Sequence, residues 1–194
     1  MTTTHDHDLN RRNMLKGGVG ALVALMLEAS NSARADAPAI AAVRKDPRYA
    51  FADRISDLVI PTSDTPGASA AHVADFLLLA VDHRMSDIKP EMLQQVGETL
   101  DGAAKGKFMR LPRARQMQLL AKLDKDAFAS REAPSGSLAY SWRRVKTAII
   151  AGYYTSEIGA SKELIYEPVP GQFKNITLTP SFRNRSNEGF GGDL

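Results

Sequence analysis

The run YAFADRISDLV at positions 49–59, followed by IPTSDTPGA at 60–68, determines how the folded part of this chain begins. Phe51, Ile55 and Leu58 recur three and four positions apart, which is the spacing of one apolar face of an α-helix. Pro61 ends this helix because the residue before a proline avoids the helical conformation. The second run is rich in Thr, Ser, Asp, Pro and Gly, so it predicts a turn before the next helix.

The same spacing of apolar residues recurs further along the chain. It predicts four more helices, at about 68–84, 90–104, 112–130 and 137–151. Phe108 is expected to anchor the connection between two of them. No strand-rich region and no internal repeat is found, so the sequence predicts an all-α fold, a single helical bundle of about five helices. We place this helical domain at residues 49–152.

The last part of the chain has a different composition. Gly152 is expected to end the last helix, and Pro168, Pro170 and Pro180 make a long helix after it unfavourable. We therefore expect residues 153–194 to form a long, irregular, extended C-terminal arm. Its final stretch is rich in Asn, Arg, Ser and Gly, which is typical of a disordered tail or of an arm laid over another protein.

The N-terminus has the order of features that an export signal requires. Arg11 and Arg12 precede a short apolar run, and the run ends at a small-residue cleavage site formed by Ala33 and Ala35. The adjacent arginines indicate a twin-arginine (Tat) signal, which exports proteins that are already folded. We therefore assign residues 1–35 to a cleavable signal peptide, residues 36–48 to a leader, and the mature protein to the periplasm.

Two other interpretations of the N-terminus stay open, an ordinary secretory signal that contains two arginines and a retained membrane anchor. The apolar run at 19–27 is short and contains Gly20. A membrane-spanning helix needs roughly 20 apolar residues. The low hydrophobicity of the run favours the Tat interpretation.

Composition excludes several kinds of chemistry. The chain has no cysteine, so it has no thiol nucleophile, no thiolate-bound iron–sulfur cluster and no covalent c-type haem site. Basic residues number 25 and acidic residues 22, which is too even a balance for a nucleic-acid-binding surface. We expect neither a cofactor nor a metal in this chain.

The titratable residues form no evident catalytic site. His72 and His83 would lie roughly 16 Å apart on one continuous helix, so they could not share a metal ion. We expect them to be solvent-facing or to cap the helix. Asp53 and Asp57 share a helix face, but a general acid–base pair also needs a pocket, and an exposed helix face is the simpler interpretation.

Two clusters that contain aromatic residues each allow a binding role or a structural role. Arg143 and Arg144, next to Trp142, could bind an anion or stack at an interface, or could lie on an ordinary helix surface. Tyr153 and Tyr154 could anchor a partner or pack in the core. The sequence alone leaves both alternatives open.

Two stretches in the expected order resemble the gluconate 2-dehydrogenase subunit 3 family. The first is ISDLVIPTSDTPGA at 55–68, and the second is GYYTSEIG at 152–159. The second is followed by Tyr166 and by PVPG at 168–171. The resemblance covers about residues 50–173, and the Tat signal also fits this family.

The resemblance implies a role in a complex. A member of this family is the small (gamma) subunit of a flavin dehydrogenase. It pairs with a large FAD-containing subunit of the glucose–methanol–choline type, and a cytochrome c subunit often takes the electrons onward. The small subunit carries the large one through the Tat translocase. Related complexes oxidise gluconate, glucose or glycosides, and the segment 153–159 is similar to that of the glucoside 3-dehydrogenase branch.

We expect the arm to contact the large subunit, because prolines reduce the entropy lost on docking and aromatic side chains are common anchors. The expected interface residues are Tyr153, Tyr154, Tyr166, Pro168, Pro170 and Phe173. A stand-alone periplasmic protein that binds a small ligand is the main alternative, and a pocket ringed by Trp142 and the tyrosines would favour it. An exported enzyme in its own right is a third class.

Overall fold

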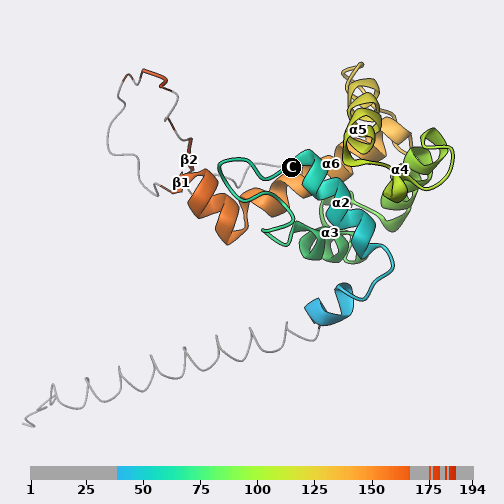
Figure 1. Ribbon diagram of the computed structural model, residues 1–194, viewed down its shortest axis with the longest axis horizontal. Coiled ribbons are helices and arrows are strands. Elements are labelled where there is room, and N and C mark those ends of the chain that lie inside the picture. The colour runs from blue at the N-terminus through green and yellow to red at the C-terminus, as the bar shows by residue number, and fades with distance from the viewer. Residues whose placement is uncertain (1–38, 167–174, 176, 180–181, 183, 187–194) are drawn as a thin grey trace, which may run out of the picture. The chain divides into compact units, whose positions relative to one another are not determined.

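The computed structural model describes residues 39–166, 175, 177–179, 182 and 184–186 (Figure 1). The chain divides into two compact units, Met1–Arg44 and Lys45–Leu194. In the first unit, residues 39–43 are helical.

The described part of the second unit is helical, as the sequence predicts. Its five α-helices are α2 (Tyr49–Val59), α3 (Val73–Asp82), α4 (Pro90–Ala103), α5 (Arg113–Ala127) and α6 (Leu138–Tyr154). The 3₁₀-helices η1 (Met85–Asp87) and η2 (Phe108–Arg110) lie between α3 and α4 and between α4 and α5, and the π-helix η3 (Gly159–Glu163) follows α6. The strands β1 (Ile165–Tyr166) and β2 (Arg185–Ser186) pair in parallel.

The long helix α6 is the centre of the packing (Figure 1). It contacts α3, α4 and α5, while α2 packs against α3. Trp142, Val145, Ile149 and Tyr153 follow one another at helical spacing on α6 and are all buried. A helix with such a stripe buries it against its neighbours, which is why the bundle forms around α6.

The connection between α2 and α3 differs from the prediction. The sequence predicts a helix from about residue 68, whereas α3 begins at Val73. His72 takes a left-handed backbone conformation with φ of 54°, and the Val73 N–H donates to the Ala68 carbonyl at 3.1 Å. Side-chain spacing does not reveal a left-handed residue, because the apolar residues on either side of it keep their positions.

Helix α6 also extends beyond its predicted end. Gly152 lies inside the helix, and a Cβ placed on it would lie 2.6 Å from Cδ1 of Phe76. The glycine therefore permits close packing against α3 and does not end the helix. The expectation of an extended arm directly after Gly152 is wrong for residues 153–163, where helix and turn continue to Glu163.

An arginine joins the beginning of α2 to the end of α3. The Arg48 guanidinium donates to Asp46 Oδ2 at 2.7 Å and to Asp82 Oδ1 at 2.9 Å. The hydrogen bonds from Arg48 to Asp46 hold the pKa of Asp46 below its ordinary value. The three side chains fix the start of the folded unit against the bundle.

Within the described residues, no helix has both the length and the apolar character that crossing a membrane requires.

Candidate partner-binding surface

The two stretches singled out in the sequence meet in the structure. The Tyr153 hydroxyl, near the end of α6, donates to the Pro66 carbonyl at 2.8 Å. The Thr65 hydroxyl donates to Oε2 of Glu163 in η3 at 2.5 Å. We call this contact between the α2–α3 loop, residues 60–68, and the segment 153–163 the motif junction.

The loop at 60–68 is closed on itself by backbone contacts. The Ala68 N–H donates to the Ile60 carbonyl at 2.9 Å, and the Gly67 N–H donates to the Thr62 hydroxyl at 3.1 Å. A Cβ on Gly67 would lie 2.5 Å from the Thr62 nitrogen and 2.6 Å from the Ile60 oxygen. The loop closes tightly only because residue 67 has no side chain.

The segment after α6 is fixed by a serine. The Ser156 hydroxyl donates to the Tyr153 carbonyl at 2.6 Å and accepts from the Gly159 N–H at 3.0 Å. A Cβ on Gly159 would overlap the Tyr153 carbonyl oxygen. This arrangement turns the chain into η3 and brings Glu163 to the loop.

The outer side of the motif junction is open to solvent. Thr62, Ser63 and Asp64 at the tip of the loop are exposed, as is Glu157 after α6. Tyr154 is 36% exposed, and its ring meets the Tyr153 ring edge to face at 5.3 Å. The junction therefore presents an ordered, polar surface with one aromatic side chain.

The structure separates the two tyrosines that the sequence groups together. Tyr153 is buried within this chain, so of its two possible roles it takes the core one here. Tyr154 lies at the surface. Tyr166 contributes backbone to β1, opposite Ser186, while Pro168, Pro170 and Phe173 lie outside the described residues. The interface predictions for the arm stay predictions.

Removing the Tyr153 hydroxyl gives a first test of the junction. We expect Tyr153→Phe to reduce the free energy of unfolding by about 0.5–1.5 kcal/mol, the net contribution of one hydrogen bond. Urea unfolding followed by the fluorescence of Trp142, the single tryptophan, measures this loss. An unchanged unfolding midpoint would show that the hydrogen bond does not hold the loop.

The same variant should change the response to high pH. Burial raises the pKa of Tyr153 above 10.0, so the folded chain keeps this proton when the unfolded chain loses it. Stability is therefore complete below pH 10 and falls as the pH rises towards the folded pKa. The Tyr153→Phe variant lacks this ionisation, so its stability should fall less steeply in that range.

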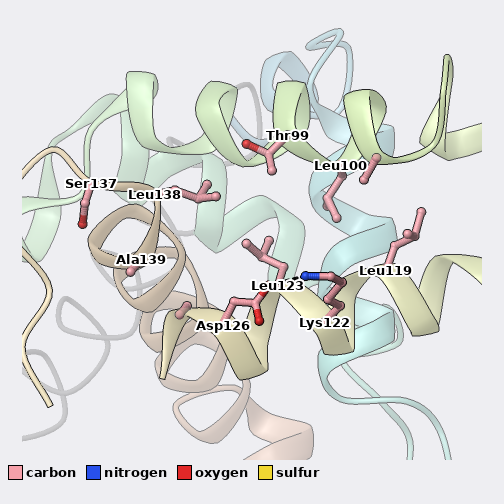
Figure 2. Close-up of a pocket in the computed structure, with 11 residues that line it drawn as sticks. Thr99, Leu100, Leu119, Lys122, Leu123, Asp126, Ser137, Leu138 and Ala139 are labelled. Carbon is pink, nitrogen blue, oxygen red and sulfur yellow. Dashed lines mark hydrogen bonds and ion pairs between the residues drawn. The ribbon is translucent and has the colours of Figure 1, made fainter. Parts of the chain in front are cut away.

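A cavity lies at the other end of α6 (Figure 2). It has a volume of about 430 Å³ and lies between α4, α5 and the first residues of α6. Leu100, Leu119, Leu123 and Leu138 line it, and the Lys122–Asp126 ion pair lies at its edge. Neither Trp142 nor a tyrosine lines it, so this is not the aromatic pocket that would favour a small-ligand-binding protein.

The two histidines are at the surface, and Asp57 is in ion pairs. His72 and His83 are exposed at the two ends of α3, as expected. Asp57 binds Arg113 of α5 and lies 3.7 Å from Arg54, so it is not paired with Asp53. Among the described residues, no group of three or more His, Cys, Asp or Glu is placed to hold a metal ion.

Arg143 and Trp142 support the bundle. The Arg143 guanidinium donates to the Ala127 carbonyl at 2.7 Å and to the Ser130 carbonyl, which covers the end of α5. The Trp142 ring is buried, and its Nε1 donates to Asp124 at 2.8 Å. The anion-binding interpretation of Arg143 therefore has no support, because its donors are directed at backbone carbonyls.

Sequence reasoning singled out Tyr153 but missed the contact between Thr65 and Glu163. Thr65 and Glu163 are 98 positions apart, and each is an ordinary polar residue in its own segment. The only signal available was the glycine in a loop dense in turn formers, because a glycine there often marks a close backbone approach.

The fold and the junction define a class of protein, a small α-helical domain that presents an ordered loop surface. The family model for gluconate 2-dehydrogenase subunit 3 matches residues 46–171, which is more than half of the chain. The chain belongs to this family, whose members are accessory subunits of a dehydrogenase complex. Comparisons with curated proteins and with solved structures give no match.

Proposed function

We propose that this chain is the non-catalytic gamma subunit of a periplasmic, FAD-dependent sugar or glucoside dehydrogenase complex. In this proposal the FAD and the substrate belong to a large subunit of the glucose–methanol–choline type. A cytochrome c subunit accepts the electrons in complexes that have one. The observation that carries the proposal is the family match over residues 46–171.

The motif junction supports a binding role. The matched region contains both segments of the junction, and their outer residues face solvent. Glycines at positions 67 and 159 and the buried Tyr153 fix the backbone of that surface. A surface that is ordered before binding loses less entropy when a partner docks, so it suits a stable complex.

Such a subunit would act on its partner by mass action. If the small subunit binds the large subunit only in its folded state, it stabilises that state. The gain is about 2.7 kcal/mol when the free small subunit is present at 100 times the dissociation constant. It would also cover apolar surface that otherwise promotes aggregation. A Tat signal on the small subunit would then export the folded pair.

Export of the pair is testable through the two signal arginines. We expect an affinity-tagged chain, isolated from the periplasm, to co-elute with a larger protein that has a flavin absorbance spectrum. Arg11→Lys with Arg12→Lys should leave both proteins in the cytoplasm, because the Tat pathway depends on the arginine pair. Fractionation followed by dehydrogenase activity measures the distribution.

The control is a variant with two basic residues of the mature domain exchanged, Lys122→Arg and Lys125→Arg. This variant and its partner should be exported normally. A single colourless chain that elutes alone and is stable would contradict the complex. A flavoprotein that reaches the periplasm with the arginine-pair variant would contradict export by this chain.

A further inference from the structure

The segment from Lys105 to Arg115 is strongly basic. It contains five basic residues and no acidic residue in eleven positions. All five side chains are exposed: Lys105, Lys107, Arg110, Arg113 and Arg115. We call these five residues, together with Arg54 of α2, the basic surface.

The backbone beneath the basic surface is held rigidly. Phe108 is fully buried, and its ring meets that of Phe51 edge to face at 6.4 Å. The Phe108 N–H donates to Asp101 Oδ1 at 2.7 Å, and its carbonyl accepts from Nε2 of the buried Gln116 at 3.0 Å. Lys107 and Arg110 therefore project from a fixed turn, while Arg113 and Arg115 project from the start of α5.

Few acidic groups neutralise this charge. Arg113 pairs with Asp57, and Arg54 lies near the same carboxylate. Asp101 adds a second carboxylate beside the turn, because its Oδ1 accepts from the Phe108 N–H. Among the described residues, Lys107 and Arg110 form no ion pair, and they lie in one turn because the Arg110 N–H donates to the Lys107 carbonyl at 3.0 Å.

The start of α5 adds to the positive potential. The N-terminus of a helix carries a partial positive charge, which acidic residues in the first turn usually offset. The first turn of α5 has no acidic residue and contains Arg113 and Arg115. The isolated chain therefore keeps an unfavourable arrangement of charge that a negatively charged partner would relieve.

Residue types around the basic surface indicate a protein as that partner. Met109 and Met117 are each 39% exposed beside the arginines. Arginine and methionine are enriched in protein interfaces, and a fixed arginine matches carboxylates in a defined geometry. A membrane-binding surface would instead show large exposed aromatic or leucine side chains next to the basic ones.

One ion pair of the basic surface lies close along the chain to the loop of the motif junction. Asp57, the partner of Arg113, lies one turn before Ile60, where the loop of the junction begins. We propose that the basic surface binds an acidic patch on the large dehydrogenase subunit and steers the assembly of the complex. This inference rests on the proposed function.

Charge reversal on the basic surface tests the inference. The full chain carrying Lys107→Glu and Arg110→Glu is co-expressed with the large flavoprotein subunit, and the dissociation constant is measured at low and high salt. We expect binding at low salt to weaken by about tenfold or more, with a slower association rate and a smaller salt dependence.

A matched control makes the same change of charge at two residues outside the basic surface. Lys125→Glu with Arg131→Glu alters one exposed lysine and one exposed arginine away from the basic surface, and should leave the dissociation constant within about twofold of the original. Unchanged thermal unfolding of both variants shows that they are folded.

The outcomes separate this inference from the function on which it rests. A complex that forms equally well with the Lys107→Glu, Arg110→Glu chain overturns the inference and leaves the proposed function intact. Loss of binding to phosphatidylglycerol vesicles, with the complex unaffected, also overturns it and assigns the surface to a membrane. Failure of the unaltered chain to bind any flavoprotein overturns both.

Discussion

Replacing Gly67 by alanine is expected to destabilise the chain and to disrupt the motif junction. The added Cβ would lie 2.5 Å from the Thr62 nitrogen and 2.6 Å from the Pro61 carbonyl carbon. These are backbone atoms, so no side chain can rotate away to make room. Overpacking of this kind costs about 1–3 kcal/mol or more, and the loop must open to relieve it.

Gly159→Ala tests the other half of the junction in the same way. Its Cβ would overlap the Tyr153 carbonyl oxygen, so the turn that leads into η3 must move. We expect a loss similar to that of Gly67→Ala. Both variants should also bind the large subunit more weakly than their stability alone would predict, because the surface they distort is the one proposed to bind.

A third glycine provides the control. Gly102 lies in the last turn of α4, and a Cβ built on it has no atom within 4 Å. Alanine is favoured over glycine in a helix by about 1 kcal/mol, so Gly102→Ala should be neutral or stabilising. Urea unfolding followed by Trp142 fluorescence measures all three variants. Equal midpoints for Gly67→Ala and Gly102→Ala would contradict the tight closure of the loop.

Phe108→Ala should cause the second large loss of stability. The side chain is fully buried and packs against Phe51, so truncation leaves a cavity beneath η2. Removing a buried phenylalanine side chain costs about 3–5 kcal/mol. We expect the thermal midpoint to fall. In chains that stay folded, binding to the partner should depend less on salt, because the turn carrying Lys107 and Arg110 is no longer fixed.

Phe128→Ala is the matched control for this variant. Phe128 is 52% exposed and contacts Arg143 and Lys146 through its ring face. Exposed cation–π contacts contribute about 0.5–1 kcal/mol, so its loss should be several times smaller. Circular dichroism during heating measures both variants. Similar midpoints for the two would show that Phe108 does not anchor the turn.

The helices could be predicted because their signal is local. The predicted helix at 49–59 matches α2, and Pro90 starts α4 as expected. Phe108 was predicted to anchor its connection, and it is buried. In each case the spacing of apolar residues, or a proline, acts within a few positions of the chain, so neighbouring residues are sufficient to fix the local structure.

The ends of the elements were harder to predict. His72 takes a left-handed conformation that delays α3, and Gly152 lies within α6 because Phe76 occupies the space of its missing side chain. A glycine that ends a helix and a glycine that admits a neighbouring ring are identical in sequence. Only the position of the other helix distinguishes them.

The sequence by itself determined an all-α chain and two stretches typical of its family. The tertiary structure decided how these features are used. It brought Thr65 to Glu163 across 98 positions, buried Tyr153 while leaving Tyr154 exposed, and fixed the basic turn over Phe108. The physical reason is that periodicity and composition act between neighbours in sequence, whereas burial and hydrogen bonding depend on which distant residues the packed helices bring into contact.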